Sequence, residues 1–297
     1  MKSSIISLIA GAVLTLAVLT ITSASPEQLH SAENAASTVR SFELPQSLSI
    51  AGEELPLSSL DIQERLDREI LVNSYWQSNN LLMLKRSDKW FPIIETILKE
   101  EGIPDDFKYL ALIESGLQNI VSPAGAAGPW QIMKSTGREK GLQIDNEIDQ
   151  RYHLEKATRA ACSYLNEAYE RFDNWTLAAA SYNMGMSGTA NRLQEQRVDN
   201  YYDLRLNNET ARYIFRIAAV KHIHEHLSDY GYIYHSNEGY QLPAFDTVML
   251  DSPVSSWVNW AEQHDITYKE LRLYNPWIRS NKLTNSANNT YALLVAK

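Results

Sequence analysis

The sequence predicts a mainly α-helical protein that ends in a small α/β module. Between residues 61 and 230, apolar side chains recur every three to four positions, as in helices. The alternation of apolar and polar residues that is typical of a β-strand is not convincing anywhere in this range. After Tyr230 the composition changes to a strip rich in Tyr, Gly, His and Asn. Residues 245–297 then follow the order strand, helix, helix, strand, which is typical of a compact accessory module.

The helical region can be divided at its capping and breaking residues. A helical pattern begins at Asp61 and is closed by Gly102 and Pro104. Residues 105–117 form the next helix, with Asp105 and Asp106 favourably placed at its N-terminus. The later helices are expected over residues 153–172, 176–182 behind Asn174, and 210–226. In the module, helices are expected over residues 254–264 and 268–274 and strands near 248–250 and 291–295.

The first 25 residues have the pattern of an export signal. Lys2 precedes an uncharged apolar run over residues 5–21, and small residues follow at 23–25, as in a secretory signal peptide. The run is also long enough to be retained as a membrane anchor, so both alternatives stay open. Residues 26–60 are polar and are expected to form a linker. We therefore expect a protein of the periplasm or cell envelope, associated with the membrane if the segment is retained.

Composition excludes several classes of function. The net charge of −9 disfavours nucleic acid as a partner, since duplex binding needs a basic surface. Cys162 is the single cysteine and lies in a helical stripe, so we expect a core thiol and no disulfide framework. Of the three histidines near residue 224, only His222 and His226 share a helix face, and we expect a solvated helix end there. No metal site and no cofactor are expected.

The chemically informative stretch runs from Glu114 to Met133. Glu114 follows an apolar residue near the end of its helix and precedes a loop containing Pro123, Gly125 and Gly128. A carboxyl group partly buried against such a loop has a raised pKa, which suits a general acid near neutral pH.

Five groups of residues around and after this stretch occur in an order that resembles a known family. The groups are Glu114-Ser115, Ser122 with Gly125-Ala126, Gly128-Pro129-Trp130-Gln131-Ile132-Met133, Ala180-Ser181-Tyr182-Asn183 with Gly185, and Glu209-Thr210 with Tyr213. Together they resemble the soluble-lytic-transglycosylase-like domain of glycoside hydrolase family 23, the relatives of goose-type lysozyme, and look most like the branch of membrane-bound lytic murein transglycosylase D. The resemblance covers residues 61–230 and continues more weakly to residue 297.

The resemblance implies a lysozyme-like helical catalytic domain over residues 61–230 that cleaves peptidoglycan glycan strands. It implies cleavage of the β-1,4 bond between N-acetylmuramic acid and N-acetylglucosamine, with formation of a 1,6-anhydromuramyl end. Glu114 would be the single catalytic acid and base. The residues implied to bind substrate are Ser122, Gly128, Gln131, Met133, Tyr182, Asn183 and Tyr213. For Trp130 and Trp175, core packing is an equally good interpretation.

Residues 231–297 resemble a linker followed by a LysM-like module, through residues 254–264 and the Leu271…Asn275-Pro276 element. Such modules bind N-acetylglucosamine polymers, although a degenerate and purely structural copy is the alternative. Two further functions stay open for the whole chain. One is a muramidase-type hydrolase on the same fold, and the other is a non-catalytic peptidoglycan-binding protein.

Overall fold

The computed structural model describes residues 39–297, and the expected signal peptide or anchor over residues 1–25 lies outside this part. Phe42–Lys297 form one unit, which is described here by itself. Among the described residues, we find no helix with the length and apolar character needed to span a membrane.

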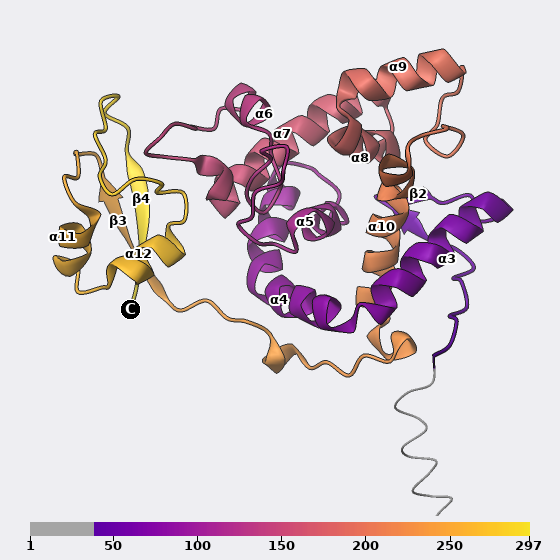
Figure 1. Ribbon diagram of the computed structural model, residues 1–297, viewed down its shortest axis with the longest axis horizontal. Coiled ribbons are helices and arrows are strands. Elements are labelled where there is room, and N and C mark those ends of the chain that lie inside the picture. Colours follow the sequence, from indigo (N-terminus) through magenta and orange to yellow (C-terminus); the bar gives the residue numbers. More distant parts are fainter. Residues whose placement is uncertain (1–38) are drawn as a thin grey trace, which may run out of the picture. The chain divides into compact units, whose positions relative to one another are not determined.

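Helices make up most of the region between residues 60 and 230 (Figure 1), as the periodicity predicts. They are α3 (Leu60–Tyr75), α4 (Gln77–Glu100), α5 (Phe107–Ser115), α6 (Lys134–Glu139), α7 (Leu154–Phe172), α8 (Trp175–Met184), α9 (Met186–Gln196) and α10 (Asn208–Glu225), with short 3₁₀ helices at Gln150–Tyr152 and Leu227–Tyr230. A further 3₁₀ helix, Ser236–Glu238, follows this region. The prediction of a mainly α-helical domain is confirmed. Two helices were not predicted: α6 lies at the end of the Gly- and Pro-rich loop, and α9 is an amphipathic helix with few buried side chains.

The helical core forms around α5 and α10. Both helices bury most of their apolar side chains, and α10 packs against α3, α5 and α8. Leu110 and Leu112 on α5 are fully buried, as are Ile214 and Phe215 on α10. Burial of these four side chains stabilises the fold by roughly 1.5–3 kcal/mol each. This packing holds the end of α5 and the first half of α10 in fixed positions.

The segment that precedes α3 is part of the core, which corrects the prediction of a polar linker up to residue 60. Strands β1 (Ser49–Ile50) and β2 (Glu53–Glu54) form a short antiparallel hairpin, and Ile50 is buried in the main core cluster. The Glu53 carboxylate accepts hydrogen bonds from the backbone N–H groups of Trp175 (2.6 Å) and Thr176 (2.8 Å) at the start of α8. The hairpin therefore supplies an N-terminal anion to a helix more than 100 residues away.

Asparagine side chains cap two of the helices, and of these only Asn174 was expected from the sequence. Asn174 accepts a hydrogen bond from the backbone N–H of Leu177 at the start of α8, and Asn207 does the same for residues 209 and 210 of α10. Asp106 precedes α5 but makes no capping bond. Its carboxylate instead accepts hydrogen bonds from Ala51 N (2.8 Å) and Lys221 Nζ (2.7 Å), so it joins the hairpin to α10.

The C-terminal module has the predicted order of elements. Strands β3 (Phe245–Leu250) and β4 (Tyr291–Ala296) pair antiparallel, and α11 (Trp257–Glu262) and α12 (Tyr268–Tyr274) lie between them in sequence. Its apolar cluster also includes residues of the helical region, namely Ala127, Ile148 and Tyr152. The module and the loop around residue 148 therefore share one core.

Residues 231–244 form the connection to the module. Tyr232 is buried, and its hydroxyl donates a hydrogen bond to Ser74 O (2.6 Å). Tyr234 donates one to Asp88 (2.6 Å), and Lys85 Nζ donates one to Glu238 O (2.6 Å). The tyrosines of this strip thus fix the connection along α3 and α4 (Figure 1).

Candidate active site

Glu114 lies in the last turn of α5, where its half-buried carboxylate faces α10. The hydroxyl of Tyr213, on the buried face of α10, donates a hydrogen bond to Glu114 Oε1. Burial raises the pKa of Glu114 above its ordinary value, and the charge of Glu209 acts in the same direction. The Tyr213 hydrogen bond and the positive charge of Arg216 partly oppose this rise of the pKa. Glu114 therefore holds a proton more readily than a solvated carboxyl group does.

The end of α5 is fixed by a left-handed cap residue and two hydrogen bonds. Gly116 adopts a left-handed conformation (φ 60°) as the C-cap of the helix, a conformation that favours glycine. The hydroxyl of buried Ser115 donates a hydrogen bond to Pro129 O (2.6 Å), and Arg86 donates one to Gly116 O (2.9 Å). The first bond joins the end of α5 to the Gly- and Pro-rich loop, and the second joins it to α4, so both hold the end of the helix that carries Glu114.

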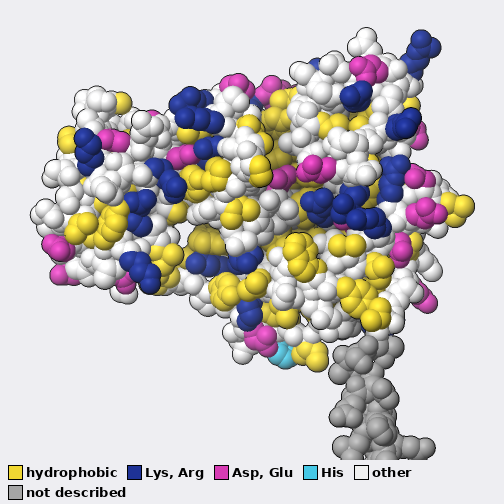
Figure 2. Space-filling view, viewed as in Figure 1, with side chains coloured by type: hydrophobic (Ala, Val, Ile, Leu, Met, Phe, Trp, Pro, Cys, Tyr) yellow, Lys and Arg dark blue, Asp and Glu magenta, His cyan; other side chains and the backbone are white. Residues whose placement is uncertain are grey.

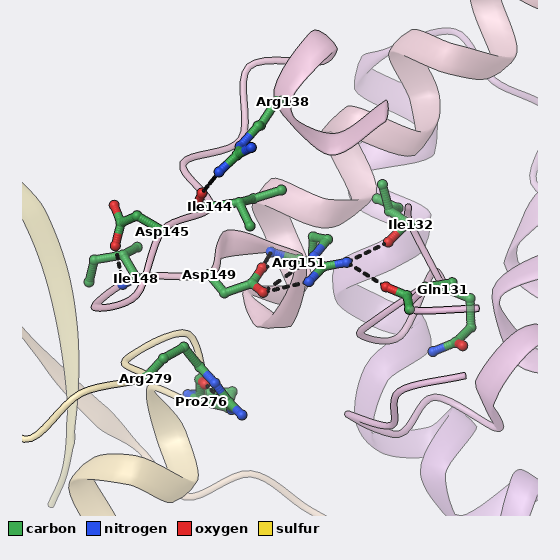
Figure 3. A network of polar contacts seen from close by, with 12 residues as sticks. Gln131, Ile132, Arg138, Ile144, Asp145, Ile148, Asp149, Arg151, Pro276 and Arg279 are labelled. Atoms are coloured by element: carbon green, nitrogen blue, oxygen red, sulfur yellow. Dashed lines mark hydrogen bonds and ion pairs between the residues drawn. The ribbon is translucent and has the colours of Figure 1, made fainter. Parts of the chain in front are cut away.

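The loop itself is held by the buried pair Arg151 and Asp149 (Figure 3). The Arg151 guanidinium binds the Asp149 carboxylate (2.7 Å) and donates hydrogen bonds to Gly125 O (2.9 Å) and Ile132 O (3.1 Å). Gly128 has φ +81°, and a Cβ atom there would lie 1.8 Å from Arg151 O. Gly128 therefore allows the backbone of the loop to lie close to the backbone of Arg151.

Four of the predicted substrate-binding residues line one cleft of about 550 Å³. They are Gln131, Met133, Tyr182 and Asn183. The Gln131 side-chain amide donates to Gly128 O (2.9 Å) and Ile120 O (3.1 Å), and the Tyr182 hydroxyl donates to Trp130 O (2.8 Å). The Met133 side chain is 42% exposed, which leaves an apolar surface for a ligand. Burial raises the pKa of the Tyr182 hydroxyl, and the negative charge of Glu114 acts in the same direction.

Ser122 and Trp130 make hydrogen bonds to other groups of the protein. Ser122 Oγ accepts a hydrogen bond from Ala126 N (3.0 Å), which closes a turn of the loop, and Ser122 does not line either of the two clefts described in this section. Trp130 is fully buried and donates a hydrogen bond to Thr158 (2.8 Å). Trp175 is half-buried and stacks on Tyr169 with ring centroids 4.0 Å apart. Both tryptophans therefore have core roles.

Glu114 lines another cleft, of about 420 Å³, whose other charged residues were not predicted from the sequence. Glu69, Arg212 and Arg216 form a charged wall in it, and Trp76 adds an indole ring that is 59% exposed. Trp76 lies between α3 and α4, where an exposed aromatic face is suited to contact with a sugar ring. An exposed Trp at a helix junction is a usable sequence signal, whereas a charged wall built from α3 and α10 is not.

The other reactive side chains that the sequence singled out lie in the core or at a helix end. Cys162 is buried, and burial raises the pKa of its thiol to about 12. His224 is half-buried beside Asn80, and burial lowers its pKa to about 3. His222 and His226 lie with ring centroids 4.3 Å apart. Among residues 39–297, no group of three or more His, Cys, Asp or Glu side chains is arranged to hold a metal ion.

The described residues thus form a helical domain in which a hydrogen-bonded carboxyl group lines a polar cleft. Comparison with known families shows the class of this domain. Residues 91–204 match the Transglycosylase SLT domain, and residues 246–297 match the soluble lytic transglycosylase C-terminal LysM-like domain. The chain therefore contains an SLT transglycosylase domain followed by a LysM-like domain, as the sequence resemblance implies.

A curated relative is the membrane-bound lytic murein transglycosylase D of Escherichia coli K12, which is 26% identical over 228 residues. The match includes 75% of this chain and 49% of that protein, so the chain spans about half the length of the curated relative. Among solved structures, the 70 kDa soluble lytic transglycosylase of Escherichia coli aligns with a TM-score of 0.40 at 22% identity, over 46% of this chain and 24% of that one. An inactive mutant of lytic transglycosylase Slt from Pseudomonas aeruginosa aligns with a TM-score of 0.38 at 20% identity, over the same shares of the chains.

Proposed function

We propose that this protein is a peptidoglycan lytic transglycosylase in which Glu114 is the single catalytic acid and base. The observation that carries the proposal is the state of Glu114. Its carboxyl group has a raised pKa, accepts a hydrogen bond from a buried tyrosine and lines a polar cleft. The SLT domain match and the relationship to lytic transglycosylases support the same reaction.

In the first step, protonated Glu114 donates its proton to the glycosidic oxygen between N-acetylmuramic acid and N-acetylglucosamine. The bond from that oxygen to the muramyl C1 breaks, and positive charge develops on the sugar ring. The raised pKa of Glu114 keeps the proton available near neutral pH. Tyr213 holds one carboxylate oxygen by donating to it, which directs the other oxygen toward the substrate.

In the second step, the Glu114 carboxylate accepts the proton of the muramyl 6-hydroxyl while O6 forms a bond to C1. The product is a 1,6-anhydro ring, no water is consumed, and Glu114 is protonated again. A hydrolase would need a group that activates water, and glycosidases commonly use a second carboxylate for this. In the two clefts, the other carboxylates are Glu69, which is bound to Arg212, and Glu167, which is bound to Lys140. Their engagement with cations favours the intramolecular reaction over hydrolysis.

The two clefts supply the substrate contacts in this proposal. In the cleft of Gln131 and Met133, amide and hydroxyl groups alternate with apolar surface, which suits an N-acetylated sugar. The Asn183 side-chain oxygen accepts from Thr210 (2.9 Å), so its amide N–H groups are oriented for an acetamido or hydroxyl oxygen. Ser122 and Gly128 act by shaping the loop, as their contacts inside the protein indicate.

The domain organisation follows from these assignments. We propose that residues 42–230 form the catalytic domain, because the hairpin before residue 60 is part of its core. Residues 246–297 form the LysM-like module, for which glycan binding is proposed from the match alone. Peptidoglycan as substrate places the protein in the cell envelope, and the N-terminal segment is proposed to direct its export.

Digestion of purified sacculi tests the proposal. Wild-type protein is expected to release soluble muropeptides, and Glu114→Gln is expected to release almost none while it stays folded. Glu167→Gln is the matched control, because this carboxylate lies in a cleft but is paired with Lys140. Equal digestion by wild type and Glu114→Gln would overturn the assignment of Glu114. Binding of sacculi without digestion by wild type would favour the non-catalytic alternative.

A further inference from the structure

We propose that Arg216 forms a carboxylate-binding site in the cleft of Glu114, and that this site recognises a carboxylate of the murein strand. The inference rests on the proposed function and adds to it a specific ionic contact with the substrate. The residues that build the site lie outside residues 91–204, the part that matches the SLT domain. They are contributed by α3 and α10, which flank the cleft.

Arg212 and Arg216 lie one turn apart on α10 but have different partners. Arg212 is engaged with Glu69, to which its Nε and a terminal nitrogen lie at 2.6 Å and 3.3 Å. The nearest approach of Arg216 to Glu69 is 4.0 Å, and no hydrogen bond from its guanidinium is found within residues 39–297. The Arg216 side chain is only 29% exposed. A guanidinium with five donors is therefore partly desolvated and faces the cleft without a close acceptor.

The charged groups of the cleft leave an excess of positive charge at Arg216. The Glu69 side chain is 1% exposed and is bound by two other cations, Arg68 at 2.5 Å and Arg212 at 2.6 Å. The remaining carboxyl group of the cleft is Glu114, and it is neutral when it holds the proton needed for the first catalytic step. In that state the cleft carries a net positive charge, although the chain as a whole carries −9. Lys and Arg side chains are also visible on the face where α3 and α10 lie (Figure 2).

A carboxylate is the ligand that fits this wall. Guanidinium groups bind carboxylates through two parallel hydrogen bonds, and a partly desolvated site strengthens such bonds. Murein offers carboxylates from two sources near the bond that is cleaved. One is the lactyl group of muramic acid when no peptide is attached, and the other is the stem peptide. The exposed face of Trp76 in the same cleft can pack on the sugar that carries the group.

Binding to defined glycan fragments tests the site without catalysis. The host protein is Glu114→Gln, and its affinity is measured by titration calorimetry for three tetrasaccharides of alternating N-acetylglucosamine and N-acetylmuramic acid. One has free lactyl carboxylates, one has these groups as methyl esters, and one carries stem peptides. We expect a carboxylate-bearing fragment to bind about tenfold more tightly than the ester. The fragment that shows the preference identifies the source of the carboxylate.

The variants then assign the preference to Arg216. Adding Arg216→Gln to the host is expected to remove the tenfold preference while the affinity for the ester stays unchanged. Arg216→Lys keeps the charge without the planar fork and is expected to retain part of the preference. Arg192→Gln is the matched control, because Arg192 is exposed on α9 and pairs with Glu195. Thermal unfolding of each variant reports whether the fold is kept.

The outcomes separate this proposal from the proposed function. If the host binds acid, ester and peptide fragments equally, the carboxylate site is wrong and the transglycosylase proposal stands. Equal weakening of acid and ester binding by Arg216→Gln would also overturn it, because Arg216 would then act only through the shape of the cleft. If none of the fragments binds and wild type does not digest sacculi, both proposals fall.

Discussion

The hydroxyl of Tyr213 on α10 donates a hydrogen bond to the carboxylate of Glu114 on α5, across 99 positions of sequence. Tyr213 is buried, and burial together with the negative charge of Glu114 raises its own pKa, so it stays a neutral donor at physiological pH. The hydrogen bond stabilises ionised Glu114, whereas burial stabilises the protonated form. This opposition suits a single group that must both give and take a proton.

Replacing Tyr213 by Phe is expected to shift the pH dependence of activity. The change removes a hydrogen bond that lowers the pKa of Glu114, so that pKa rises further. Because the first step needs protonated Glu114, activity falls as pH rises through this pKa, and the alkaline limb of kcat/KM should move to higher pH. We also expect kcat to fall about tenfold, because the carboxylate loses its orienting donor. An unchanged alkaline limb, measured by turbidity loss of sacculi, would contradict the assigned hydrogen bond.

Glu114→Gln is expected to stabilise the protein at neutral pH. The folded-state pKa of Glu114 is raised, so the folded protein holds this proton more tightly than the unfolded chain does. The free energy of unfolding therefore decreases as pH rises from the unfolded-state pKa through the folded-state value. Glutamine removes this loss, and the Tm of the variant should exceed that of wild type at pH 7 and equal it near pH 4. A constant Tm difference between these pH values would show that ionisation of Glu114 has no cost.

Two glycines of the Gly- and Pro-rich loop allow a matched test of its packing. Gly128 and Gly125 both have positive φ, +81° and +86°, but only at Gly128 would a Cβ meet the backbone of Arg151. Gly125→Ala is expected to lower the free energy of unfolding by about 1–2 kcal/mol, the cost of the left-handed conformation. Gly128→Ala should cost more than about 4 kcal/mol, because backbone must move. Similar costs for the two variants, in urea unfolding, would contradict the close approach at Gly128.

Arg151→Met is expected to destabilise the protein and to weaken the loop that carries Gln131. It leaves the buried Asp149 carboxylate without its cation, which costs about 3–5 kcal/mol and lowers Tm on the order of 10 °C. Arg159→Gln is the control, because its pairs with Glu100 and Glu101 are exposed, and Tm should stay within about 3 °C. If both variants unfold at the wild-type temperature, the Arg151 network does not hold the loop.

Local sequence signals predicted most of the helices and the module. The stripe of residues 154–172 agrees with α7, and Asn174 caps α8 as its position suggests. The hairpin over residues 49–54 was missed because its composition is polar, and its role depends on Glu53 reaching the start of α8. Contacts across more than 100 residues leave no periodic trace in the sequence.

At the candidate site, too, local sequence signals identified some residues and missed those that depend on long-range packing. Glu114 could be singled out because an isolated acid precedes a loop with several glycines, and Tyr213 follows from its motif. The wall of Glu69, Arg212 and Arg216 could not, because a charged residue on a predicted helix normally faces solvent. Only the packing of α3 on α10 shows that Glu69 is buried and that Arg216 faces a cleft.

The chemical form of the product tests the central claim most directly. Sacculi digested by wild-type protein in water enriched in ¹⁸O are analysed by mass spectrometry of the released muropeptides. If Glu114 transfers the proton of the muramyl 6-hydroxyl, the products carry 1,6-anhydromuramyl ends and no ¹⁸O. Products with reducing N-acetylmuramic ends that contain ¹⁸O would show that water is the nucleophile and would contradict the proposed reaction.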